Sequence, residues 1–381
     1  MEEWRFIDLG PQDPYMAQCF YEAVAICVDR GTSPNTLIVT QPSSPYVCIG
    51  YHQRLEEEID VEYCRSKGLP IIRRGQGGGA VYLDSNQVFY QLVAHEDSPA
   101  IPTDVEELFR KCLAATVHVY RSLGVPAEYK PINDVVVRGK KISGNGAGRL
   151  GKAVILVGNI ILDWDLDSLV RVLKVPDEKF RDKMAKSMRE WLSSLRQELG
   201  YVPPVERIRD LIVEGFEKAL GVRFARGEPT EEELRVYREE VLPKHKSPEW
   251  LYLPEERHPW ARPGRVVKIA DGVRVVSVAH KARKMIRLTA ELHEDRILDV
   301  IIAGDFFAVP AEAVRELEEA LRGCRLVEDE LRKRIEEFYA RTGVETPGMG
   351  PEDFVAAFMR LREAVEAYLP SVRPAAKPEE R

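Results

Sequence analysis

The sequence predicts an α+β protein of two domains, in which a mixed, largely antiparallel sheet is backed by helices. Three observations lead to this prediction. Strand-like and helix-like hydrophobic patterns alternate irregularly over the first 250 residues. A stretch rich in Pro and aromatic residues, 243–263, is expected to form a stiff, partly packed connector before a second series of strands followed by helices. Finally, 381 residues with 44% hydrophobic content are enough for two cores.

The first domain is expected to span 1–250 and to open with a strand at 5–7. Apolar residues at helical spacing then predict a helix over Pro14–Arg30. The segment 60–67 is predicted to be a helix that ends at Gly68, because glycine is favoured just past a helix end. Further strands are predicted at 36–40, 46–50, 87–94 and 153–162, and further helices at 104–123, 167–173, 177–198, 205–220 and 231–241.

The second domain is expected to span 263–370 and to consist of four strands followed by three helices. Turns are predicted at Asp271-Gly272 and at 293–295, between runs of strand-like residues. Residues 371–381 contain mainly Pro, Ala and charged residues, so a disordered tail is expected there. The strands are predicted at 265–270, 273–280, 284–293 and 296–302, and the helices at 311–321, 328–342 and 351–369.

Composition excludes several classes of function. The net charge of −7 and the lack of a concentrated basic patch argue against nucleic acid as the main partner. No apolar run approaches the length of a membrane span, and the start, Met1-Glu2-Glu3-Trp4, lacks a secretory pattern. Six scattered cysteines without a zinc pattern fit a reducing cytoplasm. The shortage of Asn and Gln beside abundant Glu, Arg and Pro is typical of a thermophilic source.

A glycine-rich segment with two arginines, LPIIRRGQGGGAVY, occupies residues 69–82. Without Cβ atoms, Gly77–Gly79 can bring backbone N–H groups close to a ligand, and Arg73 and Arg74 offer forked donors to an anion. The segment is therefore a candidate anion cradle, although a hairpin with solvent-facing arginines also fits. No Lys-Ser/Thr follows, and Ala-Val-Tyr-Leu begins a strand rather than a helix. The nucleotide triphosphate loop and the dinucleotide fingerprint are thereby excluded.

A second segment, NDVVVRGKKISGNGAG at 133–148, reads as a strand, a tight turn at 138–140 and a strand that carries Lys141 toward more glycines. A lysine beside small residues could neutralise charge on reacting phosphate and carboxylate oxygens. An ordinary lysine in water remains the alternative.

Together, RRGQGGGAVYLD at 73–84, ND at 133–134 and KISG at 141–144 resemble the signature of the lipoate–protein ligases. PYVCIGYHQ at 45–53 and VGNIILD at 157–163 are similar to flanking stretches of that family. The resemblance covers the first 250 residues. It implies a catalytic domain with the fold of class II aminoacyl-tRNA synthetases and biotin ligases.

The resemblance implies a two-step acyl transfer with ATP, Mg²⁺ and lipoate. Lipoate is activated to lipoyl-AMP, and the lipoyl group passes to a lysine of an acceptor domain. That domain could belong to the E2 subunit of a 2-oxoacid dehydrogenase, the glycine-cleavage H protein or a carrier protein of sulfur oxidation. A monomer is expected.

The resemblance also implies the site residues, among which Lys141 is expected to be catalytic and to hold the carboxyl or acyl oxygen. Asp134 is a candidate for metal or acceptor-lysine contact, with capping of its turn as the alternative. The residues expected to bind ATP and lipoyl-AMP are Arg74, Gly79, Ala80, Val81, Tyr82 and Lys141, and those expected to line the lipoate pocket are Gln76, Gly77, Gly78, Gly158 and Asn159.

The chain departs from the family pattern at three positions. Gln76 stands where the family often has Ser or Thr, and it could replace the hydroxyl with a longer reach. Leu83 replaces a histidine, and a histidine is also common near Val157. These departures bear on substrate preference rather than on the reaction.

Related octanoyl- and lipoyl-transferases work without ATP through a cysteine thioester, and they form the alternative function. No cysteine lies between Lys141 and Asn159, where that nucleophile would be wanted. Cys48 and Cys64 lie nearer the motifs and stay open as reactive thiols. The Gly-Arg-Gly-Arg-type signature of biotin ligases is absent.

The second domain resembles the accessory domain of lipoate ligases, on the strength of IAGDFF at 302–307. In some species that domain is a separate chain that adenylation requires. Its fusion here implies that one polypeptide performs the complete ATP-dependent reaction.

Overall fold

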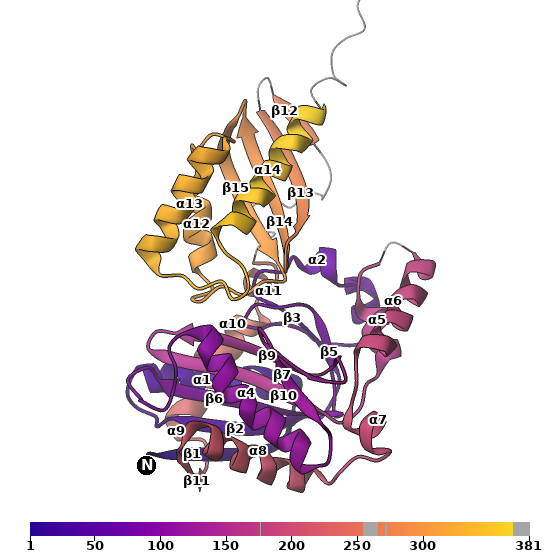
Figure 1. The fold of residues 1–381 in the computed structure, drawn as a ribbon, viewed down its shortest axis with the longest axis vertical. Helices are drawn as coiled ribbons and strands as arrows, with labels where there is room; N and C mark the ends of the chain where they lie inside the picture. The colour runs from indigo at the N-terminus through magenta and orange to yellow at the C-terminus, as the bar shows by residue number, and fades with distance from the viewer. Residues whose placement is uncertain (176, 254–265, 271–272, 369–381) are drawn as a thin grey trace, which may run out of the picture. The chain divides into compact units, whose positions relative to one another are not determined.

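The computed structural model describes residues 1–175, 177–253, 266–270 and 273–368. The chain divides into two compact units, Met1–Leu253 with Val309–Ala311, and Pro254–Ala308 with Glu312–Arg381. Both units combine helices with mostly antiparallel sheets (Figure 1), which confirms the predicted α+β class.

An eight-stranded sheet forms the centre of the first unit. β1 pairs in parallel with both β2 and β11, and the other neighbours are antiparallel. The sheet is therefore largely antiparallel with a parallel edge, as the irregular order of patterns predicts. In spatial order the strands are β11 (Arg223–Gly227), β1 (Glu3–Gln12), β2 (Thr36–Pro42), β6 (Gln87–His95), β10 (Ala153–Ile161), β9 (Lys140–Leu150), β8 (Asp134–Val137) and β7 (Ala127–Lys130).

A separate three-stranded sheet carries the glycine-rich segment. Its order is β4 (Ile71–Arg73), β3 (Tyr46–Ile49) and β5 (Val81–Leu83), with β3 parallel to β4 and antiparallel to β5. Residues 74–80, which join β4 to β5, are called the glycine bend below. The bend therefore links the two outer strands of this sheet across the end of β3.

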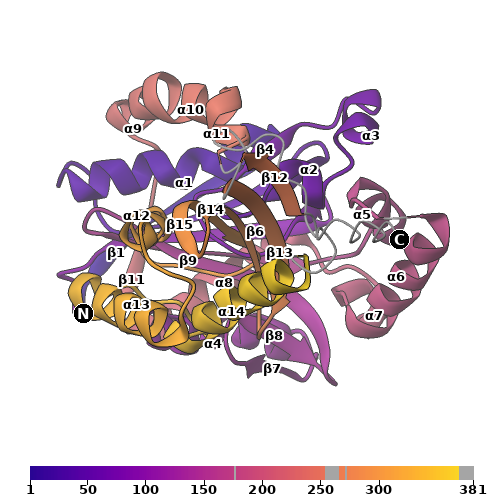
Figure 2. The ribbon, with the colours of Figure 1, turned by 90° about the horizontal axis from the view of Figure 1, so that it is seen from above.

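Helices cover both faces of the large sheet, because successive strand residues point to opposite sides. Ile38 of β2 packs in the core beneath α1 (Pro14–Asp29), whereas its neighbour Leu37 packs in the core beneath α4 (Val105–Ser122) and α8 (Val205–Leu220). Figure 2 shows α1 and α4 on opposite sides of the strands. Asp13 caps α1 by accepting from the amides of Tyr15 and Met16, and Pro14 occupies the first turn, where it loses no bond.

Two predictions for this unit are wrong in detail. The helix predicted at 177–198 is two helices, α6 (Glu178–Trp191) and α7 (Leu195–Leu199), because Ser194 turns extended and caps the second helix. The stiff connector predicted from 243 begins too early, since α10 (Leu242–Lys246) and α11 (Pro248–Leu251) occupy its first part. Their prolines lie in the first turn, where proline is compatible with a helix. The rest of that connector, 254–263, lies outside the described residues.

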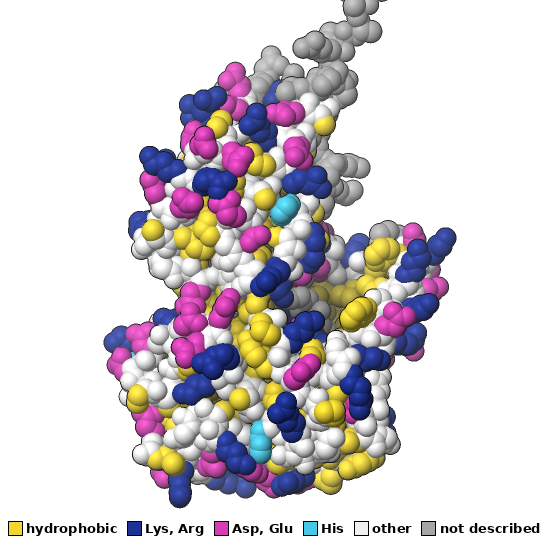
Figure 3. All heavy atoms as spheres, in the orientation of Figure 1, with side chains coloured by type: hydrophobic (Ala, Val, Ile, Leu, Met, Phe, Trp, Pro, Cys, Tyr) yellow, Lys and Arg dark blue, Asp and Glu magenta, His cyan; other side chains and the backbone are white. Residues whose placement is uncertain are grey.

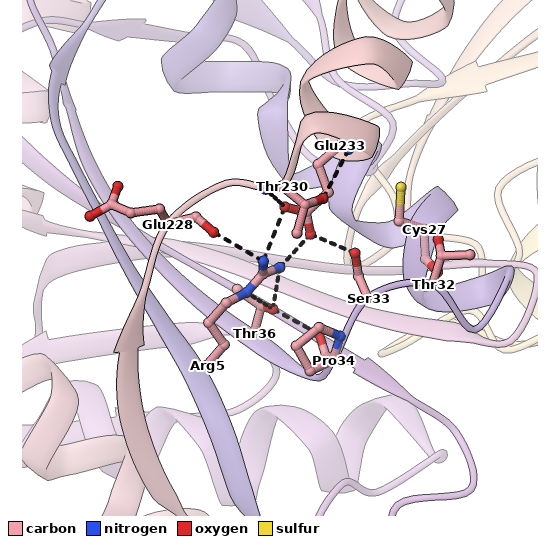
Figure 4. Close-up of polar contacts among 9 residues, drawn as sticks. All are labelled: Arg5, Cys27, Thr32, Ser33, Pro34, Thr36, Glu228, Thr230 and Glu233. Carbon is pink, nitrogen blue, oxygen red and sulfur yellow. Dashed lines mark hydrogen bonds and ion pairs between the residues drawn. The ribbon is translucent and has the colours of Figure 1, made fainter.

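The remaining helices of the unit are short. They are α2 (Leu55–Glu58), α3 (Val61–Ser66), α5 (Leu166–Val172), α9 (Glu231–Val236) and a π-helical turn (Tyr237–Val241). The start of α9 is tied to the sheet by Arg5 of β1, which pairs with Glu233, a fully buried side chain (Figure 4). The carboxylate of Glu233 also accepts from the hydroxyl of Ser33, and Thr230 completes a capping box with it.

The second unit contains an antiparallel four-stranded sheet and three helices, as predicted. Its core is made of residues between Val276 and Val365. The predicted turn at Asp271-Gly272 and the tail 371–381 lie outside the described residues. The elements are β12 (Val266–Ala270), β13 (Val273–Lys281), β14 (Met285–His293), β15 (Arg296–Gly304), α12 (Ala313–Leu321), α13 (Glu328–Thr342) and α14 (Pro351–Tyr368).

Three further observations concern the helices and the surface of the protein. Within the described residues, no helix has both the length and the apolar character needed to cross a membrane. On the face drawn in Figure 3, basic and acidic side chains are interspersed. Helix α6 has no buried residue, and Phe180 and Trp191 on it are 50% and 63% exposed.

Candidate functional site

The glycine bend is shaped by Arg74, which curls back over it. The Arg74 guanidinium donates to the carbonyl oxygens of Gly77, at 2.7 Å, and Gly79, at 2.9 Å. Its own amide donates to Ile49 O on β3. The Arg74 side chain therefore provides hydrogen-bond donors for the carbonyls of Gly77 and Gly79. The amides of the bend point away from these bonds.

Close backbone contact fixes the other side of the bend. A Cβ on Gly50 would lie 2.0 Å from Gly78 O, so only glycine fits there. Gly78 has φ 97°, a value that L side chains rarely adopt. The Tyr51 amide donates to Gln76 O at 2.9 Å. These contacts explain the glycines at both 50 and 78.

The amides of Gly77, Gly78 and Gly79 donate no hydrogen bond to any part of the chain that the structure describes. Gly77 and Gly78 are buried, whereas Gly79 is exposed. Buried N–H groups without an acceptor are costly, and a row of them beside a glycine turn is suited to an anion. The anion cradle therefore stays an interpretation that rests on these amides. The two arginines, which were expected to offer donors to the anion, bond to backbone carbonyls instead, Arg73 to Gly50 and Arg74 to Gly77.

One face of β9 brings the bend and Lys141 together. Gly144, Gly146 and Gly148 alternate along this face, because strand residues two apart point the same way. Ideal Cβ atoms on Gly146 and Gly148 would each lie 3.4 Å from the Gln76 side chain. The ideal Cβ of Gly144 would lie 3.9 Å from Lys141 Nζ. The ammonium and the Gln76 side chain thus lie over neighbouring glycines, about 7 Å apart along the strand.

Lys141 pairs with Asp134, and Asn159 is fixed beside the same glycine, Gly144. Its Nζ lies 2.7 Å from Asp134 Oδ1 on β8, and both side chains are about one-third exposed, at 37% and 33%. Asn159 of β10 accepts from the Gly144 amide at 2.9 Å and donates to Gln87 Oε1 at 3.1 Å. Asp134 therefore forms an ion pair with Lys141, so capping of its turn is not its whole role.

Gly158, in contrast, faces away from the bend. Its ideal Cβ would lie 2.1 Å from Asn145 Oδ1 and 2.4 Å from Tyr90 OH, on the face covered by α4. Tyr90 also bonds to Thr116 of α4 at 2.6 Å. The side-chain amides of Asn145 and Asn133 each donate to the backbone carbonyl of the other residue. Gly158 is thus required by this buried network and lies on the opposite side of the sheet from Gln76.

The last residue of the bend, Ala80, and the first residues of β5, Val81 and Tyr82, were also predicted to bind the nucleotide. Ala80 and Val81 are half-buried and Tyr82 is buried. Burial raises the pKa of Tyr82 even though Ser168 is hydrogen-bonded to it. Leu83 is buried in the core beneath α1. A histidine there would have to be buried among apolar side chains, which explains why leucine is acceptable at this position.

Tyr21, which sequence patterns did not indicate, also builds the site. Tyr21 of α1 donates to Gln76 Oε1 at 2.8 Å in the buried interior, which fixes the amide orientation of Gln76. Burial raises the pKa of Tyr21 well above its usual value, so its hydroxyl remains a donor. Arg73, beside Arg74, is fully buried. No local signal marks Tyr21, because its role depends on the packing of α1 over the bend.

All six cysteines are buried free thiols: Cys19, Cys27, Cys48, Cys64, Cys112 and Cys324. Cys48 lies nearest the bend, with Sγ 3.6 Å from Arg74 Nη1. Burial raises the pKa of the Cys48 thiol, and the opposing effect of Arg74 does not overcome it. The pKa of Cys64 is likewise raised by burial, to about 11. Among the described residues, no group of three His, Cys, Asp or Glu side chains is placed to hold a metal.

Comparisons with known proteins agree with this geometry. Residues 13–217 match the lipoyl protein ligase A/B catalytic domain, and residues 285–358 match the bacterial lipoate protein ligase C-terminus. An octanoyltransferase (LipM) of Kyrpidia tusciae is 32% identical over 274 residues, which cover 66% of this chain and 99% of that protein.

Two solved structures are similar to the same part of the chain. The bipartite lipoate protein ligase of Thermoplasma acidophilum, studied with its E2 lipoyl domain, is 31% identical, with a TM-score of 0.58, over 66% of this chain and 97% of that one. A lipoate-protein ligase A bound with ATP is 28% identical, with a TM-score of 0.57, over 66% of this chain and 99% of that one. The chain therefore belongs to the lipoyl protein ligase A/B family.

Proposed function

We propose that this protein is an ATP-dependent lipoate–protein ligase that makes lipoyl-AMP and transfers the lipoyl group to a lysine of an acceptor domain. The observation that carries the proposal is made over β9: the Gln76 side chain of the glycine bend and the Lys141 ammonium lie over neighbouring glycines of this strand, and the amides of Gly77–Gly79 have no acceptor among the described residues. An acyl-adenylate needs both, because its phosphate suits a row of amides and its acyl oxygen suits a nearby cation.

In the first step, a carboxylate oxygen of lipoate attacks the α-phosphorus of ATP and pyrophosphate leaves. Positioning and electrostatics supply the catalysis. Gly79, Ala80 and Val81 would contact the nucleotide at the end of the bend, and Tyr82 of β5 would pack beside it. Lys141 would neutralise charge on the carboxylate and α-phosphate oxygens. Arg74 would act by fixing the backbone conformation of the bend through its hydrogen bonds to the carbonyls of Gly77 and Gly79.

The acyl chain would lie over the glycine face of β9. Gln76, Gly77 and Gly78 would form one wall, and Asn159 would lie at the end near Lys141. Val157 packs beside Gly146 on this face, so an apolar group stands where the family often has a histidine. Gly158 would contribute indirectly, by making room for the network of Asn145 and Tyr90 on the opposite face.

In the second step, the amine of the acceptor lysine attacks the acyl carbonyl of lipoyl-AMP. An amide forms, AMP leaves, and the attacking nitrogen gives up one proton. The acceptor would be a lipoyl domain of a 2-oxoacid dehydrogenase E2, a glycine-cleavage H protein or a sulfur-oxidation carrier protein. Asp134 lies beside Lys141 and would be the carboxylate available to orient the incoming amine.

Mg²⁺ would enter as part of the MgATP substrate. Such ions are commonly held by one or two carboxylates together with substrate phosphates. Asp134 is the candidate ligand near the bend, and the pairing of its Oδ1 with Lys141 leaves its second oxygen for that role.

Octanoyl transfer without ATP is the second candidate, since the similar protein of Kyrpidia tusciae is an octanoyltransferase. Two observations favour the ligase. Cysteines near the bend are buried and have raised pKa values, which disfavours a thiolate nucleophile. A match to the lipoate ligase C-terminus at 285–358 adds a domain beyond the 66% of the chain that aligns with the octanoyltransferase.

One experiment separates the two candidates. The full chain is incubated with an apo acceptor domain and either lipoate, ATP and Mg²⁺ or octanoyl-acyl carrier protein without ATP, and the acceptor mass is measured. The ligase proposal expects a lipoyl adduct that depends on ATP. An octanoyl adduct formed only from the carrier, and lost on replacing Cys48 or Cys64 with Ser, would establish the transferase instead.

A further inference from the structure

Arg73 joins two segments that lie far apart in the sequence. Its buried guanidinium donates from Nη1 to the carbonyls of Gly50, Tyr51 and Gln53, at 2.7–2.9 Å. From Nε and Nη2 it donates to the carbonyls of Trp250 and Leu251 in α11, at 2.7–3.1 Å. The loop that packs against the glycine bend is thereby fastened to the end of the first unit.

The carbonyl of Arg73 is held by the same end of the unit. It accepts from His245 Nδ1 and from Trp250 Nε1, each at 2.9 Å. The amide of the same peptide, that of Arg74, donates to Ile49 O at 3.0 Å. Both sides of the peptide that leads into the bend are therefore fixed by hydrogen bonds.

The donors on α10 and α11 are themselves held in place. His245 Nε2 lies 2.7 Å from Glu22 Oε2 of α1, and the imidazole is fully buried. The Trp250 ring packs edge-on against Tyr51 and His245, with centroids 5.6 and 5.4 Å away. Lys244 Nζ lies 4.3 Å from the centre of that ring. Each ring nitrogen of His245 therefore lies within hydrogen-bond distance of an oxygen atom.

We propose that His245 and Trp250 are positioning residues, which set the glycine bend through the Arg73–Arg74 peptide. Neither touches the glycines of the bend in any contact above, so they act through Arg73. The inference rests on the proposed role of the bend as an anion cradle. A row of amides binds an anion well only when its orientation is fixed before binding. The α10–α11 segment supplies that constraint from a part of the chain that carries no ligand-binding motif.

The test compares Trp250→Phe with Trp4→Phe in the full chain. Both remove an indole N–H donor, since Trp4 Nε1 donates to Glu2 at 2.8 Å, but Trp4 lies in the core beneath α4. Hydrogen exchange of the Arg74 and Tyr51 amides, which bond to Ile49 and Gln76, is followed by mass spectrometry. Trp250→Phe is expected to speed their exchange about five- to tenfold, and Trp4→Phe to leave it unchanged.

Kinetics supply the second readout. Trp250→Phe should raise the KM for ATP about five- to tenfold and change kcat by less than about twofold. His245→Ala should behave alike, and His245→Gln should restore part of the loss, because glutamine can still donate to Arg73 O. Equal exchange in Trp250→Phe and Trp4→Phe would overturn the inference. A wild-type chain without lipoate-dependent ATP turnover would overturn the proposed function instead, because exchange is measured without substrate.

Discussion

Single side chains determine the chemistry of this site, and Lys141 is the one whose position is most informative. It lies at the start of β9, where the glycine-rich face allows its side chain to remain close to the strand. Asp134 holds the ammonium at 2.7 Å while leaving it accessible, because both side chains are about one-third exposed. A cation that is held but not enclosed can be shared with an incoming substrate.

Replacing Lys141 by Ala should reduce lipoyl-adenylate formation about 10²- to 10³-fold, because the charge that stabilises the reacting oxygens is lost. The melting temperature should fall by less than about 4 °C, since a half-exposed ion pair contributes about 0–1 kcal/mol. The measurement is lipoate-dependent exchange of pyrophosphate into ATP. Lys140→Ala, at the neighbouring half-buried position, is the control and should keep wild-type exchange. Wild-type exchange by Lys141→Ala would remove this residue from the mechanism.

Gly79 allows a separate test of the bend. It is exposed, its φ is not positive, and an added Cβ would meet nothing within 4 Å. Gly79→Ala should therefore fold normally and still raise the KM for ATP about tenfold, since a misplaced methyl group in a pocket costs about 1–3 kcal/mol. Gly75→Ala, whose Cβ would make only an ordinary contact with Tyr21, is the control. A KM unchanged in both variants would mean that no ligand approaches Gly79.

Local patterns could identify Lys141 and the glycines because their chemistry is recorded in adjacent residues. They could not indicate Tyr21, whose hydroxyl meets Gln76 only after α1 has packed on the sheet. The family resemblance also implied Gly158 as part of a pocket, although its face follows from the pairing of β10 with β9, which places it against Asn145. Side-chain contacts that depend on strand register cannot be read from composition alone.

At the scale of elements, periodicity was sufficient for the long helices and insufficient where prolines begin short ones. α1, α4 and α8 have continuous apolar faces and lie close to their predicted ranges. The segment 243–251 was expected to be the first part of a stiff connector because of its prolines and aromatic residues. It forms α10 and α11 instead, and packs Trp250 and His245 against the segments around β4. Its structure depends on the buried carboxylate of Glu22, which lies on a helix more than 200 residues away in the sequence.

Glu22 makes the attachment of α10 sensitive to acid. Burial raises its pKa, but the hydrogen bond and charge of His245 and the charge of Lys244 act more strongly, so its pKa is lowered from the usual 4.5. A depressed carboxyl pKa contributes stability that is complete above the unfolded pKa and lost as pH falls through the folded one. The contribution of Glu22 should therefore disappear below about pH 4.5.

The corresponding experiment measures urea unfolding of wild type and Glu22→Gln at pH 7 and at lower pH. At pH 7 the variant should be less stable by about 1–3 kcal/mol, because the buried imidazole of His245 and the partly exposed Lys244 lose the carboxylate with which they pair. The difference should shrink below about pH 4.5. Glu214→Gln, which removes an exposed carboxylate paired with Lys218, should have a small effect at every pH. A Glu22→Gln difference that does not change with pH would show that the carboxylate is not ionised in the folded chain.

At the scale of the whole molecule, the motifs expected to be catalytic all lie in the first unit, whereas the match to the lipoate ligase C-terminus lies in the second apart from residues 309–311. The second unit has its own hydrophobic core, made of residues between Val276 and Val365. The assignment of 1–250 as the catalytic domain and 263–370 as an accessory domain remains a prediction. It was based on a change of composition and on the family resemblance, and neither reports what the second domain contributes to the reaction.

A chain ending at Leu253 tests that contribution. If the second domain is needed for adenylation, the shortened chain should lose lipoate-dependent pyrophosphate exchange by at least about tenfold while still transferring a lipoyl group from added lipoyl-AMP. Transfer by the shortened chain shows that the glycine bend and Lys141 are intact, because both steps use the same bound adenylate. Adding residues 254–381 as a second chain should restore exchange. Full exchange by the shortened chain alone would restrict the reaction to the first unit, and the second would then have to serve acceptor binding or stability.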